Sequence, residues 1–287
     1  MENKIKGLRF IVGSGCNYNC FYCHHEGYYK KDKVVNLSEK IKKLKDFADQ
    51  NNINSISITG GEPFIYFEEL ELILKTFNEK KYTITVNTNL SLLEPNLEKI
   101  KNYNKIEFHV NLSSLNSIEH KNIVRAPLLD NVLKNLQLLK ETHHKVCLNI
   151  PALKGYNHNE LKNLFNYAKE NNFIPRFLVL LPMDDNQKQN VMTVEEIMNI
   201  FNGKLEKKYS YGRYNITSND GDFEIVKCLC VEMECETCKK ETYMHITPEL
   251  NIKYCMLSKD EILVDYGSFN NIGESFKEAQ KRLELIK

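Results

Sequence analysis

The sequence predicts an α/β fold: a partial, TIM-like (βα)6 barrel followed by a small C-terminal module. Apolar, β-rich runs alternate with longer amphipathic stretches from the amino terminus to about residue 180, the pattern of repeated βα units around a parallel sheet. After Pro182 the alternation stops, and a Tyr- and Asn-rich stretch leads into a second group of cysteines. Six repeats fit an open partial barrel better than a closed eight-stranded one.

The elements follow in strand–helix order. The β-rich runs predict strands near residues 7–12, 54–58, 82–86, 106–112, 145–150 and 174–181. Apolar residues at helical spacing, several after an Asn or Ser cap, predict helices near 37–50, 66–79, 92–101, 127–142 and 157–171. Further helices are expected at 193–201 and 272–286. We therefore divide the chain into a barrel domain, residues 1–205, and an auxiliary module with a terminal helix, residues 206–287.

Composition excludes several classes of protein. The chain has 39 basic and 38 acidic residues, interspersed, so no electrostatic footprint for nucleic acid is present. The amino terminus has a short apolar stretch interrupted by Arg9, and no run approaches the length of a bilayer span. We therefore expect a cytoplasmic protein without membrane or nucleic-acid partners.

Cysteine usage is the strongest signal of chemistry. Eight of the nine cysteines fall in two groups, and clustered cysteines without a secretion signal indicate metal ligation. Directly after the first predicted strand, GSGCNYNCFYCHHEG places Cys16, Cys20 and Cys23 at C-x3-C-x2-C spacing. Three thiolates on one loop can hold a [4Fe-4S] cluster and leave the fourth iron open. The alternatives are a zinc site, favoured by the adjacent His24 and His25, and three unliganded buried cysteines.

With Tyr22 as its aromatic residue, this C-x3-C-x-aromatic-C motif resembles the signature of the radical S-adenosylmethionine (SAM) superfamily. The resemblance implies that the open iron binds the amino and carboxylate groups of SAM, and that reductive cleavage yields a 5′-deoxyadenosyl radical. The turn Gly60-Gly61-Glu62-Pro63 follows the second predicted strand, where glycines let a backbone approach a ligand closely. By the same resemblance, this turn contacts the methionine end of SAM.

Polar residues at later strand ends are further candidates. Asn87, Asn111 and Arg125 lie on or after predicted strands, and the carboxyl ends of barrel strands converge on one face. We interpret these three residues as SAM contacts. The alternative is that they are polar residues that only form turns or end strands. Cys147, alone in an apolar run, is expected to be a core residue.

Four segments in a fixed order narrow the resemblance: CNYNCFYCHHEG, GGEP, VNLSSLN and NIPALKGYNHNELKNLFNYAKENNFIPRFLVLLP. From about residue 7 to 182 the chain resembles the GTP 3′,8-cyclase of molybdenum-cofactor synthesis.

The second cysteine group contains Cys228, Cys230, Cys235, Cys238 and Cys255, with a C-x2-C knuckle and a turn at 248–251 that would return Cys255 along a hairpin. The resemblance implies an auxiliary [4Fe-4S] cluster of the twitch type on Cys235, Cys238 and Cys255, with Cys230 or Cys228 as a fourth ligand. Structural zinc is the alternative.

The chain departs from the cyclase where arginines would hold a triphosphate. It has Gly15 before the first cysteine, Phe64-Ile65-Tyr66 after the GGEP turn, and Lys239-Lys240-Glu241 after the knuckle. Phe64, Tyr66 and Phe67 indicate a less charged substrate pocket, or simply a helix start packed on the core.

We expect an oxygen-sensitive enzyme acting on a small or nucleoside-like molecule other than GTP, with an electron donor such as flavodoxin or ferredoxin. The alternatives are a peptide-modifying enzyme and a non-enzymatic zinc or redox-sensing protein.

Overall fold

The computed structural model describes residues 4–24, 34–209, 212–228, 239, 241–258 and 260–286. These residues form one curved sheet with the strand order β11-β10-β1-β2-β3-β4-β5-β6-β9-β8-β7. The strands are β1 (Lys4–Ile11), β2 (Ser55–Thr59), β3 (Thr83–Thr88), β4 (Ile106–Asn111), β5 (Lys145–Ala152), β6 (Ile174–Val179), β7 (Lys204–Lys208), β8 (Arg213–Thr217), β9 (Phe223–Lys227), β10 (Glu241–Ile246) and β11 (Ile252–Lys253). The α-helices are α1 (Leu37–Gln50), α2 (Phe67–Thr76), α3 (Leu97–Ile100), α4 (Ser117–Val124), α5 (Leu129–Lys140), α6 (Leu161–Glu170), α7 (Val194–Ile200) and α9 (Phe269–Glu284).

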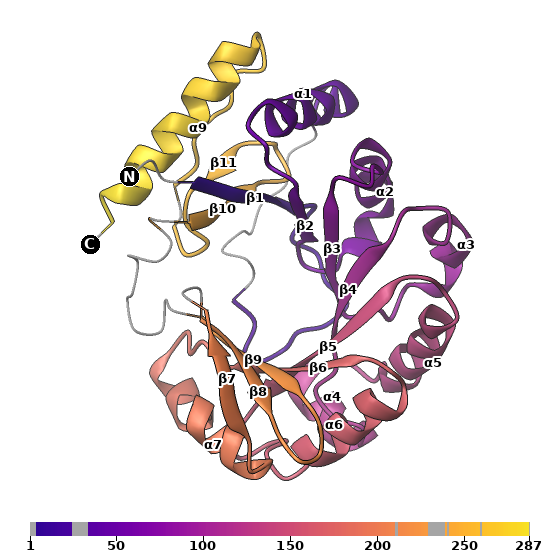
Figure 1. Ribbon diagram of the computed structural model, residues 1–287. Helices are drawn as coiled ribbons and strands as arrows, with labels where there is room; N and C mark the ends of the chain where they lie inside the picture. Colours follow the sequence, from indigo (N-terminus) through magenta and orange to yellow (C-terminus); the bar gives the residue numbers. More distant parts are fainter. Residues whose placement is uncertain are drawn as a thin grey trace.

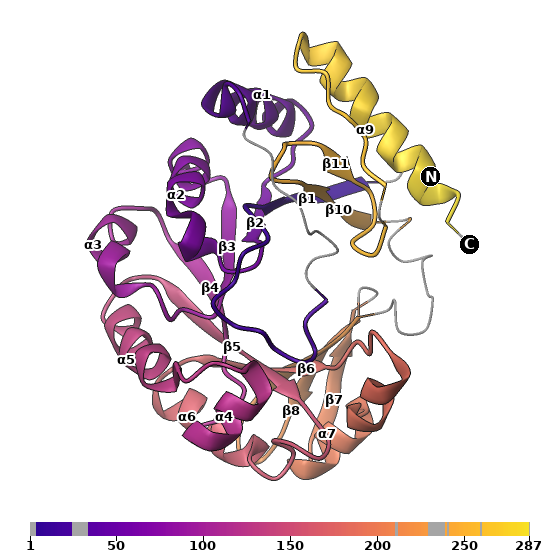
Figure 2. The same cartoon turned by 180° about the vertical axis from the view of Figure 1, so that it is seen from behind.

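The six strands β1 to β6 are parallel neighbours in chain order, each joined to the next through a helical crossover. The sheet curves so that these helices lie on its outer side, and its two edge strands, β7 and β11, do not pair with each other (Figures 1 and 2). This arrangement is an open, partial barrel, and the predicted fold class is confirmed.

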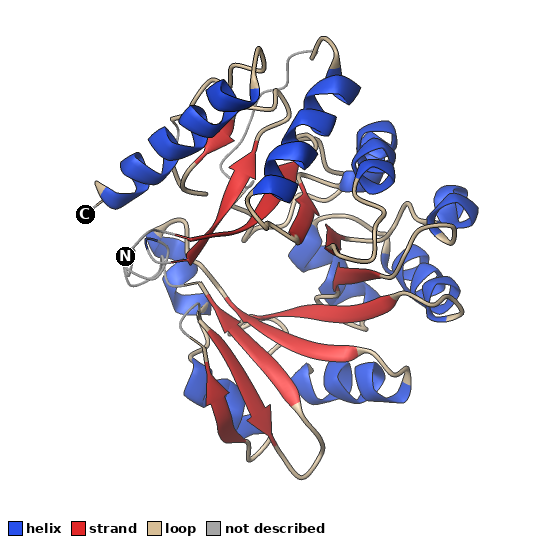
Figure 3. Ribbon diagram, turned by 45° about the horizontal axis from the view of Figure 1, so that its top comes forward, coloured by secondary structure: helices blue, strands red, loops and turns tan. Residues whose placement is uncertain are grey.

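The two faces of the sheet differ in polarity. In β4, Ile106, Phe108 and Val110 are fully buried, and Glu107 alternates with them on the other face. Because successive side chains of a strand point to opposite faces, the apolar set meets the outer helices that Figure 3 shows in blue. The core therefore lies between sheet and helices, and the inner face carries polar groups in place of the branched apolar layers that fill a closed barrel.

The structure adds elements that the sequence pattern did not predict. Helix α4 is capped by Asn116, whose side chain accepts hydrogen bonds from the backbone N–H groups of Ile118 and Glu119. Its eight residues are too few to show a clear helical periodicity. The predicted helix at 92–101 is a 3-10 turn, Glu94–Asn96, followed by the short α3.

The strands after residue 205 join the barrel sheet at both edges. β9 pairs in parallel with β6 and antiparallel with β8, whereas β10 pairs in parallel with β1. All five residues of β7 are exposed, so that strand has no apolar alternation for a sequence to reveal. The predicted hairpin is confirmed, since β10 and β11 pair antiparallel through His245 and Lys253. The division at residue 205 stays a prediction.

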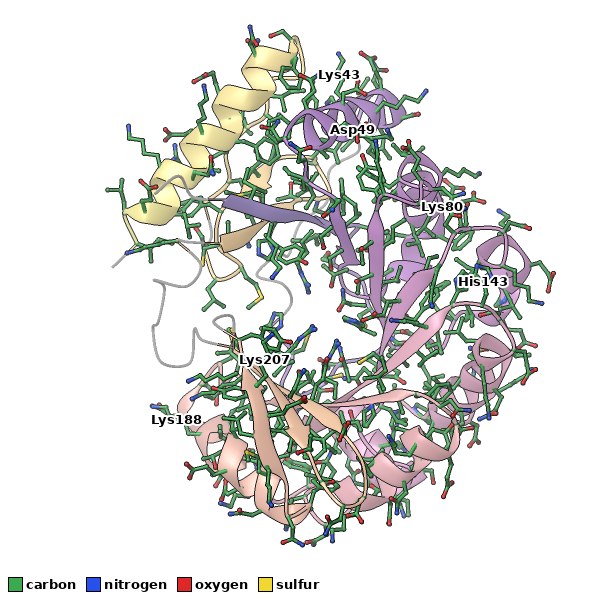
Figure 4. The ribbon with its side chains drawn as sticks, in the orientation of Figure 1. Lys43, Asp49, Lys80, His143, Lys188 and Lys207 are labelled. Carbon is green, nitrogen blue, oxygen red and sulfur yellow. The ribbon has the colours of Figure 1, made fainter. Side chains whose placement is uncertain are left out.

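The C-terminal helix α9 packs against α1. The rings of Phe47 and Phe276 stack with centroids 4.1 Å apart, and Nζ of Lys43 donates to the Tyr266 carbonyl at 2.8 Å. Figure 4 shows Lys43 and Asp49 on the outer side of the sheet, where α1 lies. Of the helices that the structure describes, none combines the length and apolar character needed to cross a membrane.

The Phe47–Phe276 contact predicts how α9 contributes to stability. Phe276 is 1% exposed, so Phe276→Ala should lower the free energy of unfolding by about 3 kcal/mol, because it leaves a cavity. Phe269→Ala is the matched control: Phe269 is 38% exposed, and its loss should cost less than about 1 kcal/mol in anaerobic urea unfolding. Equal losses for the two variants would contradict this packing.

Candidate active site

The loop that carries the first three cysteines, residues 12–24, here called the cluster loop, runs against the turn that follows β2. Backbone hydrogen bonds join Gly61 N to Gly13 O at 2.8 Å and Glu62 N to Gly15 O at 2.9 Å. A Cβ added at Gly61 would lie 2.1 Å from the carbonyl oxygen of Gly15, and one at Gly60 would lie 2.6 Å from that of Gly13. The two glycines are therefore required for the close approach of the two backbones.

Tyr66 supports the cluster loop from the other side. Pro63 opens the 3-10 turn Pro63–Tyr66, and the Tyr66 hydroxyl accepts a hydrogen bond from Gly15 N at 2.7 Å. A Cβ added at Gly13 would lie 2.3 Å from the Tyr66 ring, so the ring occupies the space that this glycine leaves. Phe64 is buried in the core. For Phe64 and Tyr66 the packing interpretation of the sequence is therefore favoured over a substrate pocket.

The Glu62 carboxylate links this turn to the end of β3. It is fully buried, and Oε1 accepts from Thr88 Oγ1 at 2.6 Å and Phe64 N at 3.1 Å, while Oε2 accepts from Asn89 N at 2.7 Å. Burial raises the pKa of Glu62 to about 7, although these hydrogen bonds oppose the rise. The carboxylate thus fixes two strand ends relative to each other.

Asn89 continues the network to the first cysteine. Its Oδ1 accepts from Ser91 N at 2.9 Å and Ser91 Oγ at 2.6 Å, which turns Nδ2 toward Asn17 Oδ1 at 2.8 Å and Cys16 Sγ at 3.9 Å. Asn17 Nδ2 donates in turn to Ser91 Oγ at 2.8 Å. None of these three polar residues was among the predicted site residues. The run NTNLS, residues 87–91 at the end of β3, was the signal for Asn89 and Ser91, and Asn17 lies within the first cysteine motif itself.

The three thiols suit a cluster with one iron that lacks a protein ligand. Cys16 and Cys23 are exposed and Cys20 is half-buried, so the loop presents sulfur to the open side. Burial, with the nearby Cys23 and Cys16, raises the pKa of Cys20 to about 12, and a thiolate there calls for a cationic partner such as iron. In the described ranges no three metal-binding side chains converge on a single ion. A cubane cluster needs no such convergence, because each thiolate binds its own iron.

Three of the predicted SAM contacts lie beside this loop. The Tyr22 hydroxyl accepts from Asn111 Nδ2 at 2.8 Å, which joins the cluster loop to the end of β4. The backbone N–H of Asn19 donates to Val124 O at 2.9 Å, directly before Arg125. Arg125 is exposed at the C-terminus of α4 in a left-handed conformation, with φ 57°. Tyr22, Asn111 and Arg125 are thus brought to one end of the barrel.

Asn87 lies deeper on the inner face. It is on β3, and its Nδ2 donates to Ser57 Oγ and to Ile58 O, both at 3.1 Å. These contacts tie β3 to β2. The side chain of Asn87 is therefore hydrogen-bonded within the sheet, one residue before Thr88, which binds Glu62.

Most of the second cysteine group falls outside the described residues. Cys230, Cys235 and Cys238 are not described, whereas Cys228 follows β9 and Cys255 follows β11, both half-buried. The predicted ligand set therefore stays a prediction. Cys147 is fully buried in β5, but it pairs in register with His109 and therefore faces the polar inner side of the sheet, so its burial is confirmed and the predicted place in the core is wrong.

The burial of Glu62 predicts a pH dependence. Because its pKa is raised from 4.5 to about 7, the folded protein holds a proton that the unfolded chain releases in this window. The free energy of unfolding should therefore fall as the pH rises from about 4.5 to 7, by up to about 3 kcal/mol, and level off above. Anaerobic urea unfolding from pH 5 to 8 measures this slope. Glu62→Gln cannot ionise and should lack it, so the same slope in that variant would sink the assignment.

Comparison with known proteins agrees with this geometry. The sequence profile of the Radical SAM superfamily matches residues 10–168. The GTP 3′,8-cyclase of Clostridium perfringens (strain 13 / Type A) is 27% identical over 267 residues, which cover 88% of this chain and 81% of that protein. The probable GTP 3′,8-cyclase of Methanothermobacter marburgensis is 24% identical over 289 residues, which cover 96% of this chain and 93% of that protein.

Among solved structures, SuiB of Streptococcus suis bound to the precursor peptide SuiA superposes with a TM-score of 0.66 at 16% sequence identity. The match covers 89% of this chain and 60% of SuiB, so the chain spans less than two thirds of that protein. This likeness concerns the fold. With the profile match over more than half of the sequence, the chain belongs to the radical SAM superfamily of iron-sulfur enzymes, and within it resembles the GTP 3′,8-cyclases.

Proposed function

We propose that this enzyme uses a cluster on Cys16, Cys20 and Cys23 to cleave SAM and abstract hydrogen from a small-molecule or nucleoside-like substrate other than GTP. The observation that carries the proposal is the fixed path of the cluster loop, which the Gly60–Gly61 backbone, Glu62 and Tyr66 hold at one end of the barrel. When bound, the cluster and SAM supply a 5′-deoxyadenosyl radical. The reaction class would be cyclisation, rearrangement or oxidation.

The chain's own residues would bind and orient SAM. The Gly60–Pro63 turn lies against the cluster loop just before Cys16, so its backbone groups would be available to SAM bound at the cluster. Arg125 is exposed beside the loop and offers the positive charge that a carboxylate requires. The hydrogen bond between Tyr22 and Asn111, 2.8 Å long, would hold Cys23, the residue after Tyr22, close to the end of β4. Asn87 would line the inner side of the same site.

Residues 206–287 would form the auxiliary module of this enzyme. Cys235, Cys238 and Cys255 would hold a second [4Fe-4S] cluster, with Cys230 or Cys228 closing it. The hairpin β10–β11 supports this proposal, because it brings the chain back to Cys255. Zinc in place of the second cluster remains the alternative. The reducing electron would come from a donor such as flavodoxin or ferredoxin.

The substrate proposal rests on the positions at which a polyphosphate would need cations. Gly15 precedes the first cysteine, and the Tyr66 hydroxyl is already engaged by Gly15 N. Phe64 is buried in the core. These two positions therefore offer no positive charge to a triphosphate, and the third carries Lys239 and Lys240 in place of arginine forks. The first two positions suit a substrate without a triphosphate.

Peptide modification is a second candidate, favoured by a pocket on the rim. An open cavity of about 470 Å³ lies between α4 and the loop after β5, and its lining includes Ile118, 71% exposed, and Tyr156. Tyr156 stacks on Phe21 of the cluster loop at 4.6 Å, so the pocket adjoins the site. Mass shifts in a candidate precursor peptide incubated with enzyme, SAM and reductant would decide between the two substrates.

Cluster assignment is tested by metal counting and SAM cleavage. After anaerobic reconstitution we expect about eight irons and eight sulfides per chain, and release of 5′-deoxyadenosine under dithionite. The variant Cys16→Ala/Cys20→Ala/Cys23→Ala should lose about four irons and all cleavage. Four irons plus one zinc in the wild type would reassign the second site as structural. Cleavage that survives the triple substitution would refute the assignment of the first site.

The close approach of two backbones at Gly61 predicts that the substitution of this single residue weakens SAM binding. Gly61→Ala should displace the cluster loop, because the added Cβ would meet a backbone oxygen 2.1 Å away, and SAM affinity should fall at least about tenfold. Gly273→Ala is the matched control, since a Cβ there meets nothing within 4 Å and α9 gains helix propensity. Equilibrium dialysis with labelled SAM measures both variants. Unchanged affinity in Gly61→Ala would argue against this positioning.

A further inference from the structure

Four polar residues form a row on the inner face of the sheet that begins next to Asn111, the in-register neighbour of Asn149. Asn149 on β5 pairs in register with Arg176 on β6, Arg176 with Glu224 on β9, and Glu224 with Asn215 on β8. Directly paired residues of neighbouring strands point to the same face. We name these four residues the inner row.

The arginine of the inner row is buried and its charge is neutralised. Arg176 is 4% exposed, and its Nε donates to Glu224 Oε2 at 2.6 Å. Its terminal nitrogens lie 3.8 Å from Glu107 Oε1 and 3.0 Å from the His109 ring. Burial, with the nearby arginine, lowers the pKa of His109, and the hydrogen bond to Glu107 opposes this shift. A buried guanidinium requires such compensation.

Glu224 is shared between two arginines. Besides Arg176, it lies 3.7 Å from the guanidinium of Arg213, through its other carboxylate oxygen. Two arginines therefore face two glutamates, Glu224 and Glu107, on this part of the inner face. The arrangement carries no net positive charge for an anionic ligand.

The ends of the inner row present hydrogen-bond acceptors. In the described part of the chain, the side-chain oxygens of Asn149 and Asn215 are buried and accept no hydrogen bond. A buried acceptor without a donor costs about 1 to 3 kcal/mol, and a ligand N–H or O–H placed there would recover that cost. Phosphate oxygens, which are acceptors themselves, would be repelled.

We propose that Glu224 is a specificity-determining residue: it neutralises Arg176 and Arg213, so that the inner row receives an uncharged, hydrogen-bond-donating part of the substrate and rejects polyphosphate. This inference rests on the proposed function, and it takes the inner face of the barrel as the side on which the substrate binds. It adds the chemical class of the group that binds there, namely hydroxyl or amide N–H.

Inorganic tripolyphosphate is the probe for the rejected class. Reconstituted wild-type enzyme should show no saturable binding at millimolar concentration by anaerobic isothermal titration calorimetry. Glu224→Gln removes the counter-charge of two arginines and should bind tripolyphosphate about 10- to 100-fold more tightly. The control Glu94→Gln frees Lys134, its partner at 2.7 Å on the outer surface, and should gain nothing. Wild-type binding as tight as that of Glu224→Gln would overturn the proposal.

A second variant keeps this test decisive if Glu224→Gln does not fold. Glu107→Gln removes the more distant counter-charge of the same arginine, 3.8 Å away, and should give a smaller gain in tripolyphosphate affinity. Iron content and melting temperature identify folded variants. Failure of every folded variant to gain affinity would also overturn the proposal. Neither the tripolyphosphate titration nor the check of folding depends on SAM cleavage. A negative result for Glu224 can therefore be distinguished from a failure of the proposed function.

Melting temperatures test the acceptor half of the proposal. Asn149→Leu and Asn215→Leu remove buried oxygens that have no donor, and each should raise the melting temperature of reconstituted, substrate-free enzyme by about 2 °C or more. Asn111→Leu is the matched control: its amide donates to Tyr22 at 2.8 Å and accepts from Ser113 at 3.2 Å, so its loss should lower the melting temperature. Equal losses in all three variants would contradict recognition of a donor group.

Discussion

The buried Glu62 carboxylate holds together the parts on which the site depends. It binds the ends of β2 and β3 to each other, through Thr88 and Asn89, while its own backbone N–H holds Gly15 of the cluster loop. Asn89 passes this constraint on to Asn17 and Cys16. A carboxylate with three donors inside the protein is costly to bury but rigid once formed. The loop can therefore expose its thiols without losing its position.

The two faces of the sheet have different roles: the outer face forms the core, and the inner face carries the polar groups proposed to bind ligands. The outer face buries residues such as Phe108 under the helices, and α9 extends this packing through Phe276. The inner face is polar, whereas the inside of a closed barrel is filled by layers of apolar side chains. Arg176, Glu224 and their neighbours are thus placed where a closed barrel would carry core residues. A substitution there changes recognition more directly than it changes the core.

The sequence predicted the elements whose physical signal is local. Strands β1 to β6 and the long amphipathic helices follow from apolar periodicity, and the three cysteines follow from their spacing. The short α4 and the exposed β7 carry too little apolar pattern to be seen. The role of Asn89 depends on contacts with Asn17 and Ser91 that only the folded chain creates. The sequence marked Tyr66 only as an aromatic residue. Its hydrogen bond to Gly15 is possible because Gly13 and Gly15 have no Cβ atoms and leave room for the Tyr66 side chain, and the residues next to Tyr66 in the sequence give no sign of this contact.

In the proposed site, one iron of the first cluster is open and SAM binds to it. Electron paramagnetic resonance of the dithionite-reduced enzyme, recorded with SAM and with SAM labelled with ¹⁵N at its amino group, detects this binding. We expect a reduced [4Fe-4S] signal that shifts on addition of SAM and shows coupling to the labelled nitrogen. A reduced cluster whose signal is identical with and without SAM would rule out an open iron that binds SAM.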